Sequence, residues 1–401
     1  MKTMLFTTSF FFLSLISKSQ TPEITSWIIN PGSETGYGNI PSNCQAVQYT
    51  DDDVYVSCTC IPGYDIGPWT GNPNEPSNQD FTFMITRNPL ENTGTDVVTG
   101  LGHIGVWTNG VSLFNPKDAF SYNDDGVWNQ NAIVAEAISF DDCLGHPAPN
   151  GEYHTHLNPT CLYDDTNDQE HSPLIGFAFD GFPIYGAHAY ENTDGTGSIV
   201  RMESSYQMRD ITERHTLPDG TVLNASEYGP AISNQYPLGY YIEDYEFVNQ
   251  LGHLDKHNGR WCITPDYPAG TYSYFVTIDE NLDGVYPYII GPTYYGAVQS
   301  GNTGPQSGHN TVPEDALTYS PTAVVENEPS SFSIHPNPAS EFILLSSSEN
   351  LVNASYSIIN SWGQTIMKGT LKSGYQVDVR ALSAGVYFVK TATGVTRLMK
   401  Q

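Results

Sequence analysis

The sequence predicts a mainly β protein, with a β-rich main domain that holds a short helix and a small C-terminal immunoglobulin-like β-sandwich. Three features of the composition support this prediction. Only 15% of the 401 residues are charged, aromatic residues reach 12% with 26 tyrosines, and the chain holds 36 glycines and 27 prolines. Few charges, many tyrosines and many turn-forming residues are typical of β-rich extracellular proteins rather than helical cytosolic ones. The length suggests two or three domains with a substantial core.

The formal net charge of −29 limits the classes of partner. Nucleic acids and anionic membrane surfaces both attract basic proteins, so we expect neither as a partner. A strongly acidic chain is suited instead to solubility and to the binding of cations.

Residues 1–19 have the pattern of a signal peptide. Lys2 supplies the positive charge, residues 4–16 form the apolar segment, and Ser17-Lys18-Ser19 is a small-x-small cleavage site. The apolar segment is too short for an ordinary transmembrane helix, and no other segment is long and apolar enough. We therefore expect an exported protein without a transmembrane segment.

We assign residues 20–298 to the main domain. Strands are expected where apolar and aromatic residues alternate or cluster between turn signals, at residues 54–56, 81–85, 104–111 and 271–277. Residues 128–140 carry apolar side chains with helical spacing and are the best candidate for the short helix.

A cluster of histidines follows this expected helix, because five of the eleven histidines lie between residues 146 and 188. Histidine is the commonest metal ligand and the usual acid–base group near neutral pH. Because side chains alternate along a strand, His154 and His156 point to the same face. Asn150-Gly151 is a hairpin turn signal that can return His146 to them. Three neutral imidazoles suit zinc or copper, so the sequence predicts a transition-metal site on these histidines.

The same stretch resembles the signature of the YHYH family, a Tyr-His-Tyr-His run. Here the run is Tyr153-His154-Thr155-His156, so Thr155 stands in place of the second tyrosine. Flanking runs match as well: Gly145-His146-Pro147, residues 180–186, Leu254-Asp255, Asn258-Gly259-Arg260 and residues 264–272. The resemblance covers roughly the middle half of the chain. It implies the family's fold and a histidine-based site but no particular reaction. Thr155 is expected to face away from the two histidines.

Asp180, His171 and His188 are candidates for a fourth metal ligand or for a partner that fixes an imidazole tautomer. One alternative to the metal site is metal-free hydrolysis, with Asp180 and His171 as the catalytic candidates. No Gly-x-Ser-x-Gly motif supports a serine nucleophile. The other alternative is an adhesion or carbohydrate-binding module, in which a surface glycan is the partner and the histidines form a hydrogen-bonded core.

Six cysteines in an exported chain favour disulfide bonds. Cys143 and Cys161 bracket the histidine stretch and are the best pair. The connectivity of the others, Cys44, Cys58, Cys60 and Cys262, stays open, and a metal site at Cys58-Thr59-Cys60 is a weaker alternative.

A calcium site is a further candidate. Asp279, Asn281 and Asp283 are followed by Gly284 in the D-x-N-x-D-G spacing that directs alternate oxygens at one calcium ion. The twelfth position is Ile290 rather than Glu, so this is not an EF-hand.

Two segments follow the main domain. Residues 299–330 are rich in Gly, Ser, Asn, Pro and acidic residues, which predicts a linker. Residues 331–401 hold six basic and three acidic residues, so their charge of +3 contrasts with the acidic remainder of the chain. This asymmetry and the short alternating strands indicate a separate small β-sandwich.

The last segment resembles the C-terminal sorting domain (type A) of the type IX secretion system. The matching residues are the run from Ile334 to Ala339, Trp362-Gly363-Gln364, the run from Leu382 to Val389, and the basic end at Arg397 and Lys400. The resemblance implies that the type IX secretion machinery is a partner. It also implies export across the outer membrane of a diderm bacterium, with the cargo anchored to the cell surface or released.

Overall fold

The computed structural model describes residues 20–30, 32–304, 307–321, 332–347, 354–360, 365–372, 375–383, 385–391 and 394–400. The predicted signal peptide, residues 1–19, lies outside these residues. The chain divides into two compact units, Met1–Tyr319 and Ser320–Gln401. The prediction of a mainly β protein is confirmed, because the described residues form several sheets and only short helices. None of the described helices has the length and apolar character that a membrane crossing requires.

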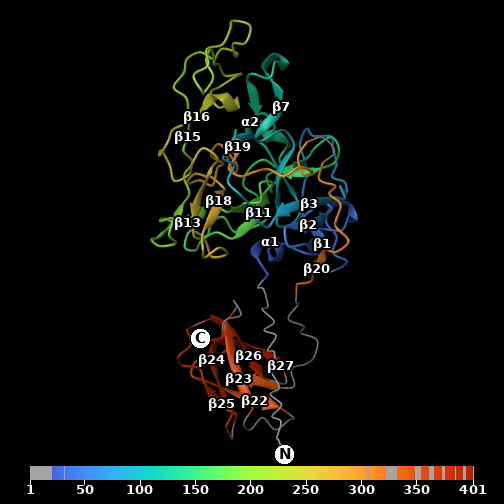
Figure 1. The fold of residues 1–401 in the computed structure, drawn as a ribbon, viewed down its shortest axis with the longest axis vertical. Helices are drawn as coiled ribbons and strands as arrows, with labels where there is room; N and C mark the ends of the chain where they lie inside the picture. The colour runs from blue at the N-terminus through green and yellow to red at the C-terminus, as the bar shows by residue number, and fades with distance from the viewer. Residues whose placement is uncertain are drawn as a thin grey trace, which may run out of the picture. The chain divides into compact units, whose positions relative to one another are not determined.

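One layer of the first unit is a four-stranded antiparallel sheet with the order β20-β1-β2-β3 (Figure 1). Its strands are β20 (Leu317–Tyr319), β1 (Cys44–Tyr49), β2 (Asp53–Cys58) and β3 (Phe81–Thr86). Strand β3 alternates buried and half-buried residues, as expected for a sheet with one face in the core. The strands predicted at residues 54–56 and 81–85 are thereby confirmed.

Part of the predicted linker belongs to this unit, which corrects the boundary placed after Val298. Strand β20 pairs with β1, and Asn302 is fully buried and hydrogen-bonded to the backbone of β3. The backbone N–H of Thr82 donates to the Gly308 carbonyl at 2.6 Å. Main-chain hydrogen bonds can add a strand to a sheet edge with little help from apolar side chains. Composition therefore predicts a linker in a segment whose backbone forms strand β20.

The second layer is an eight-stranded sheet with the order β17-β18-β12-β11-β5-β6-β10-β9. The strands are β17 (Gly259–Cys262), β18 (Thr271–Phe275), β12 (Pro183–Tyr185), β11 (Leu174–Ala178), β5 (His103–Trp107), β6 (Ser112–Phe114), β10 (Tyr153–Thr155) and β9 (Gly145–Pro147). The β6–β10 and β12–β18 pairs are parallel, and the others are antiparallel. The histidine-bearing strands β9 and β10 thus lie at one end of the sheet.

The two sheets share a hydrophobic core. Val47, Val54 and Phe83 from the smaller sheet pack in one cluster with Val106 and Phe177 from the larger one, and all five are fully buried. Burying each such side chain contributes roughly 1.5–3 kcal/mol. The histidine hairpin packs on a second core cluster, in which Tyr153 joins Trp107 and Leu113.

The helix predicted at residues 128–140 is replaced by three shorter elements. These are β8 (Asn129–Asn131), α2 (Ala132–Ala135) and a 3-10 turn η3 (Ala137–Ser139). The Asn131 side chain caps α2 by accepting the Ile133 N–H. Val134 and Ile138 are 42% and 72% exposed, so the apolar residues bury no common face. A helix without such packing is marginal, and Glu136 interrupts it with non-helical backbone angles.

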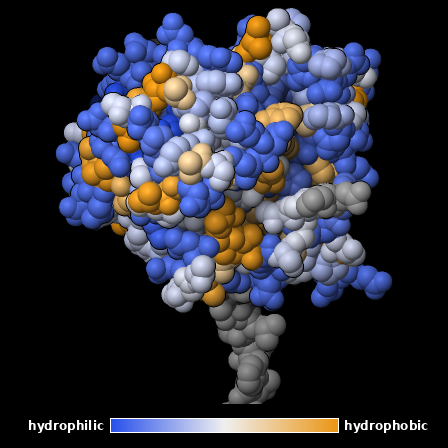
Figure 2. Space-filling view, turned by 90° about the horizontal axis from the view of Figure 1, so that it is seen from above, coloured by the Kyte–Doolittle hydropathy of each residue, from blue (hydrophilic) through white to orange (hydrophobic). Residues whose placement is uncertain are grey.

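The remaining elements of the first unit are small and lie around the two sheets. They are α1 (Pro22–Thr25), η1 (Tyr37–Asn39), β4 (Val97–Val98), β7 (Lys117–Ser121), η2 (Tyr122–Asp124), β13 (His188–Tyr190), β14 (Ile199–Arg201), β15 (Tyr206–Met208), η4 (Ile242–Asp244), β16 (Tyr245–Phe247) and β19 (Thr293–Tyr294). The face shown in Figure 2 is mostly hydrophilic and is interrupted by hydrophobic patches.

The C-terminal unit contains two sheets. One has the order β21-β22-β25 and the other β24-β23-β26-β27. Their strands are β21 (Phe332–His335), β22 (Phe342–Ser347), β23 (Ser355–Asn360), β24 (Thr365–Thr370), β25 (Gln376–Asp378), β26 (Gly385–Thr391) and β27 (Gly394–Lys400). Both sheets contribute to one core that includes Ile334, Ile343, Ile358, Val389 and Leu398. This arrangement is consistent with the expected small β-sandwich.

Candidate metal centre

A hairpin brings the three predicted histidines together. Strands β9 and β10 pair antiparallel, with His146 directly opposite His154. Gly151 in the connecting turn has φ +82°, which glycine adopts without strain, so the predicted Asn150-Gly151 turn is confirmed. His156 follows β10 and lies two residues beyond His154, on the same face.

The Nε2 atoms of the three histidines converge on one point. The His154 and His156 Nε2 atoms are 3.1 Å apart, and those of His146 and His156 are 3.4 Å apart. The three possible ligand atoms all lie within 4.8 Å of one another. For zinc–nitrogen bonds in a tetrahedral site, the ligand nitrogens are about 3.3 Å apart. The two shorter separations therefore fit the edges of such a site.

Backbone carbonyls fix the tautomers of two of these histidines. His154 Nδ1 lies 3.0 Å from the Glu152 carbonyl, and His156 Nδ1 lies 2.7 Å from the Asn115 carbonyl. A carbonyl oxygen only accepts, so both Nδ1 atoms must carry the proton and donate. In the neutral imidazoles, both Nε2 atoms therefore present lone pairs to the centre.

The third tautomer is fixed through a hydroxyl. Ser139 Oγ donates its proton to the Glu136 carbonyl at 2.8 Å, and it lies 2.7 Å from His146 Nδ1. With its proton directed at that carbonyl, the hydroxyl is free to accept from His146 Nδ1–H. All three neutral imidazoles thus direct unprotonated Nε2 atoms inward. Lone pairs at these distances repel one another unless a cation or a proton lies between them.

A carboxylate completes the cluster. Glu136 Oε2 lies 3.3 Å from His156 Nε2 and 3.5 Å from His146 Nε2, and its side chain is 33% exposed. Burial acts to raise the pKa of Glu136, but the hydrogen bond and charge of His156, with the charge of His146, outweigh it and lower the pKa. A proton on the imidazoles would therefore favour the ionised form of the Glu136 carboxylate.

Aromatic rings form part of the walls around the imidazoles. Phe114 stacks on His154 with ring centroids 3.8 Å apart, and Phe140 meets His146 edge-on at 4.9 Å. The free side of the cluster opens into a cavity of about 450 Å³. The cavity wall includes all three histidines and Glu136. A small molecule in this cavity could therefore reach the point on which the Nε2 atoms converge.

Burial keeps the histidines in the form that binds metals. Burial and the nearby charge of His156 lower the pKa of His146 to about 4, although Glu136 acts in the opposite direction. The same two causes, with the charge of His146, hold the pKa of His154 well below its usual value. Both imidazoles are therefore neutral at physiological pH and available as ligands.

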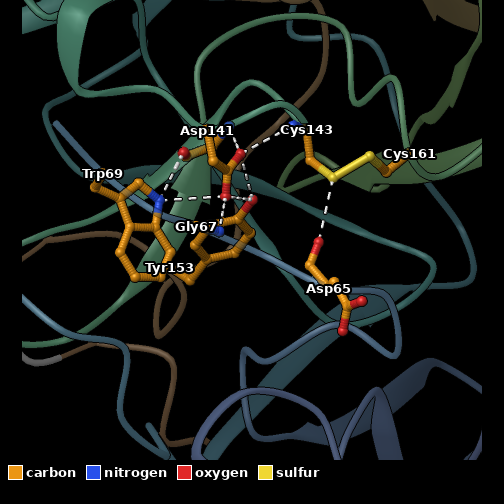
Figure 3. The surroundings of a disulfide bond; sticks show 8 residues. Asp65, Gly67, Trp69, Asp141, Cys143, Tyr153 and Cys161 are labelled. Atoms are coloured by element: carbon orange, nitrogen blue, oxygen red, sulfur yellow. Dashed lines mark hydrogen bonds between the residues drawn. A yellow bond between two sulfur atoms is a disulfide. The ribbon is translucent and has the colours of Figure 1, made fainter.

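Asp141 anchors the hairpin from behind, as Figure 3 shows. Its Oδ1 accepts the backbone N–H groups of Cys143 and Gly145 at 3.0 Å each. Its Oδ2 accepts the hydroxyl of Tyr153 at 3.0 Å and the indole N–H of Trp69 at 3.2 Å. The carboxylate thus fixes residues adjacent to both His146 and His154.

The predicted disulfide bond between Cys143 and Cys161 is confirmed, and it encloses the hairpin (Figure 3). In a chain-entropy view, closing a loop of this size stabilises the fold by about 3 kcal/mol. The other four cysteines, Cys44, Cys58, Cys60 and Cys262, are buried thiols in this structure.

The two residues that alternate with the histidines belong to the core. Tyr153 and Thr155 are fully buried, and Thr155 Oγ1 accepts the indole N–H of Trp107 at 2.9 Å. Thr155 therefore faces away from the cluster, as expected. The position at which this chain departs from the Tyr-His-Tyr-His run does not contact the converging Nε2 atoms.

Asp180 does not lie beside the histidine cluster, where it was expected. It follows β11, which is separated from β10 by β5 and β6, so about 14 Å of sheet lies between them. Its Oδ2 accepts the Tyr274 hydroxyl at 2.6 Å and the Gly296 N–H at 2.8 Å, and its Oδ1 accepts the Phe182 N–H. Asp180 therefore organises the core at the far side of the sheet, and Glu136 is the carboxylate beside the histidines.

His171 and His188 are also placed away from the cluster. His171 precedes β11, and its ring packs edge-on against Tyr185 with centroids 5.1 Å apart. His188 begins β13, and its backbone N–H donates to Ser172 Oγ at 2.9 Å. Within the described ranges, no contact joins either histidine to the metal-ligand candidates. The expected roles of His171, His188 and Asp180 as ligands or catalytic partners at this cluster therefore have no structural support.

The acidic turn at residues 279–284 is exposed. Asp279 Oδ1 accepts the backbone N–H groups of Asn281 and Asp283 at 2.8 and 3.0 Å. These bonds form an Asx-type turn, which accounts for the sequence pattern without an ion. The calcium site on Asp279, Asn281 and Asp283 stays a prediction.

Three contributors to the cluster were missed in the sequence analysis. They are Glu136, Ser139 and the carbonyl of Asn115. Glu136 and Ser139 lie in the segment predicted as a regular helix, where the pattern gave no reason to point them at His146. A backbone carbonyl such as that of Asn115 leaves no signal in the sequence.

Comparison with known proteins identifies both units. The family model described as YHYH protein matches residues 82–286, slightly more than half of the chain. A model described as the secretion system C-terminal sorting domain matches residues 333–401. A C-terminal type IX sorting domain directs export, so the protein is handled by that secretion system and reaches the cell surface or the exterior.

A search of curated proteins finds no match. Among solved structures, the chain is similar to PorZ, an essential bacterial surface component of the type IX secretion system of Porphyromonas gingivalis, at 11% identity. The match covers 92% of this chain and 60% of the PorZ chain with a TM-score of 0.15, which is too weak to carry an argument. The family assignment therefore rests on the match over residues 82–286, and the chain belongs to the YHYH family.

Proposed function

We propose that the first unit is a secreted transition-metal-binding domain in which His146, His154 and His156 hold zinc or copper. The observation that carries the proposal is the convergence of three Nε2 atoms whose Nδ1 atoms all have hydrogen-bond partners elsewhere. Metal-ligating histidines usually donate the second ring N–H to a carbonyl, carboxylate or hydroxyl, which fixes the tautomer. Here all three have that partner.

The donor set also limits the metal. Three imidazoles and a carboxylate suit zinc and copper(II), whereas calcium and magnesium take oxygen ligands. Glu136 Oε2 lies at distances from two Nε2 atoms that match the edges of a tetrahedron. We assign Glu136 as the fourth ligand, or as the group that holds a water molecule at the fourth position. When bound, such an ion supplies Lewis acidity at the wall of the adjoining cavity.

The competing explanation is a metal-free histidine core. It requires a proton on His156 Nε2. The Nε2 atoms of His154 and His146 and the Oε2 atom of Glu136 would share this proton, because the contacts within this group of atoms are 3.1 to 3.5 Å long. Such a proton would join a buried imidazolium to a carboxylate. The two explanations differ in metal content, which makes them separable by experiment. A surface glycan as partner stays a prediction, and glycan-array binding would test it.

The deciding experiment is metal analysis of the full secreted protein, purified without a His-tag and loaded with zinc or copper. We expect close to one equivalent per molecule. His154→Ala and His156→Ala should each abolish stoichiometric binding, because two imidazoles and a carboxylate hold the ion much more weakly. Glu136→Gln should lower the affinity while leaving some binding.

Two control variants make the result specific. Thr155→Ala lies between the two ligands in sequence but faces the core, and His188→Ala removes a buried histidine away from the cluster. Both should keep full metal content. The proposal fails if the wild-type protein, with the Cys143–Cys161 disulfide intact, cannot be loaded with zinc or copper. It also fails if His188→Ala removes the metal.

A further inference from the structure

A second and larger cavity adjoins the metal-side cavity. It measures about 840 Å³, and the two share wall residues including Leu101, Gly102 and Phe114. Three residues with the chemistry of a nucleophile, a base and an acid lie together on its wall: Ser307, His103 and Glu152. The metal-binding proposal uses none of these side chains.

These three side chains form a continuous hydrogen-bonded chain. His103 Nε2 lies 2.9 Å from Ser307 Oγ, and His103 Nδ1 lies 2.9 Å from Glu152 Oε1. Ser112 Oγ donates to the same Glu152 oxygen at 2.6 Å, which holds the carboxylate as an acceptor. His103 Nδ1 must therefore donate to Glu152. In the neutral imidazole, Nε2 then presents its lone pair to the Ser307 hydroxyl.

The order hydroxyl, imidazole, carboxylate is the geometric signature of an activated nucleophile. It is recognised by the contacts and not by sequence position, and it recurs on unrelated folds. Here the parts come from residues 103, 152 and 307, and none of them lies in a Gly-x-Ser-x-Gly motif. The absence of that motif in the sequence therefore does not exclude a serine nucleophile.

The surroundings hold the imidazole and the carboxylate rigidly. His103 begins β5 and is 8% exposed, and Glu152 is 4% exposed at the start of the histidine hairpin. The rings of Phe81, Phe83 and Phe179 meet the His103 ring edge-on, with centroids 5.4, 5.3 and 5.7 Å away. A base that is fixed in this way needs little reorganisation before it accepts a proton.

Ser307 arrives from the segment that the composition marked as a linker. The Gly308 N–H donates to the Gly301 carbonyl at 2.8 Å, which closes a loop around the serine. Ser307 Oγ also lies 2.6 Å from the Gly304 carbonyl and 3.0 Å from the Asn302 carbonyl. The hydroxyl therefore has carbonyl acceptors as well as His103, and it must turn its proton toward Nε2 to react.

The geometry points to an ester-hydrolysing site with Ser307 as nucleophile, His103 as general base and Glu152 as the positioning residue. Ser307 Oγ attacks the ester carbonyl carbon while its proton passes to His103 Nε2. The bond from that carbon to the alcohol oxygen breaks, and the alcohol leaves with the proton from His103. Water, activated by His103, then attacks the acyl-serine and releases the acid, which restores Ser307.

The cavity wall indicates the substrate class. Val97, Val98, Leu101, Phe114 and Val298 contribute apolar surface, and none of the described residues of the wall is a lysine or an arginine. We therefore expect a neutral ester with an apolar acyl or aromatic group rather than a phosphate or carboxylate substrate. This site does not depend on the proposed metal centre.

The test is covalent labelling of the full secreted protein with a fluorophosphonate, which reacts with activated serines. Peptide mapping should find the adduct on Ser307. His103→Ala should slow labelling and the hydrolysis of p-nitrophenyl butyrate by about 100-fold or more. Ser300→Ala, an exposed serine in the same segment, is the matched control and should react like wild type. Labelling of the wild-type protein should be unchanged in the presence of a zinc and copper chelator, which separates this site from the metal centre.

Two further variants keep the test decisive. Ser307→Cys preserves the size of the side chain if Ser307→Ala fails to fold, and it should remove fluorophosphonate labelling. Glu152→Gln should lower kcat for p-nitrophenyl butyrate hydrolysis and leave KM unchanged, because the amide no longer orients the His103 imidazole as the carboxylate does while the cavity wall is retained. A purely structural role would not produce that split. The proposal is overturned if folded wild-type protein forms no Ser307 adduct. It is equally overturned if folded Ser307→Cys is labelled by the fluorophosphonate as fast as wild type.

Discussion

The histidine cluster and the Arg214–Asp244 pair are both buried and polar, but they are satisfied in different ways. All five N–H groups of Arg214 have acceptors, which are both Asp244 oxygens and three backbone carbonyls. Asp244 also accepts the backbone N–H groups of Gly239 and Tyr241. In the histidine cluster, by contrast, three Nε2 atoms face one another, and none of them donates when each neutral imidazole carries its proton on Nδ1.

The difference separates a structural site from a functional one. A buried polar group is costly unless it is paired, so natural folds pair nearly all of them. The Arg214–Asp244 pair is complete in itself and needs nothing from outside. The histidine cluster is complete only when something positively charged joins it. The proposed metal site therefore rests on acceptors that converge in a rigid arrangement, rather than on buried polarity as such.

The largest loss of stability should come from breaking the buried Arg214–Asp244 ion pair. Asp244→Ala leaves the Arg214 guanidinium buried without its anion, and we expect a loss of about 3–5 kcal/mol in the free energy of unfolding. The control is Asp96→Ala, which breaks an exposed ion pair with Lys256 and should cost less than about 1 kcal/mol. Urea denaturation measures both. Equal losses for the two variants would contradict the structural role given to Asp244.

A smaller effect, on metal affinity, should follow from removing the side chain that fixes the tautomer of His146 in the histidine cluster. Ser139→Ala removes the acceptor of His146 Nδ1–H without removing a ligand, so metal affinity should fall by about 10- to 100-fold. Competition with a chelator of known affinity measures the change. Ser26→Ala, which loses a hydroxyl bonded to the Pro22 carbonyl away from the cluster, should keep wild-type affinity. An unchanged affinity in Ser139→Ala would mean that Ser139 does not orient His146.

The smallest effect concerns acid stability of the metal-free protein. The pKa of His146 is lowered to about 4 in the folded state, so on unfolding below about pH 6.5 this imidazole takes up a proton. The unfolded state then binds more protons, and the free energy of unfolding falls as pH drops from about 6.5 to 4. We expect His146 to account for part of this loss.

The comparison needs a matched variant, because other groups titrate in the same range. Burial raises the pKa of Glu243 to about 7, so Glu243 stabilises the folded protein as pH falls through that range. The quantity to measure is therefore the difference between wild type and His146→Gln in pH-dependent urea unfolding. The variant should lose less stability in acid. If both proteins lose the same amount, the imidazole of His146 is not held neutral by burial.

Much of the candidate site could be predicted from local sequence alone. Strand alternation placed His154 and His156 on one face, and Asn150-Gly151 marked the turn that returns His146 to them. The spacing of Cys143 and Cys161 around the hairpin indicated the disulfide. Each of these predictions depends on residues close together in the chain, where side-chain period and turn chemistry determine the geometry.

The tertiary structure alone decided which distant residues meet. Asp180 lies near the histidines in sequence, yet two strands separate it from them because β5 and β6 insert between β11 and β10. Glu136, Ser139 and the Asn115 carbonyl contact the cluster, but no sequence pattern in their segments predicts this contact. Ser307 meets His103 only because hydrogen bonds attach Asn302 and Gly308 to β3. Contacts of this kind depend on strand order and packing, and these leave no local period in the sequence.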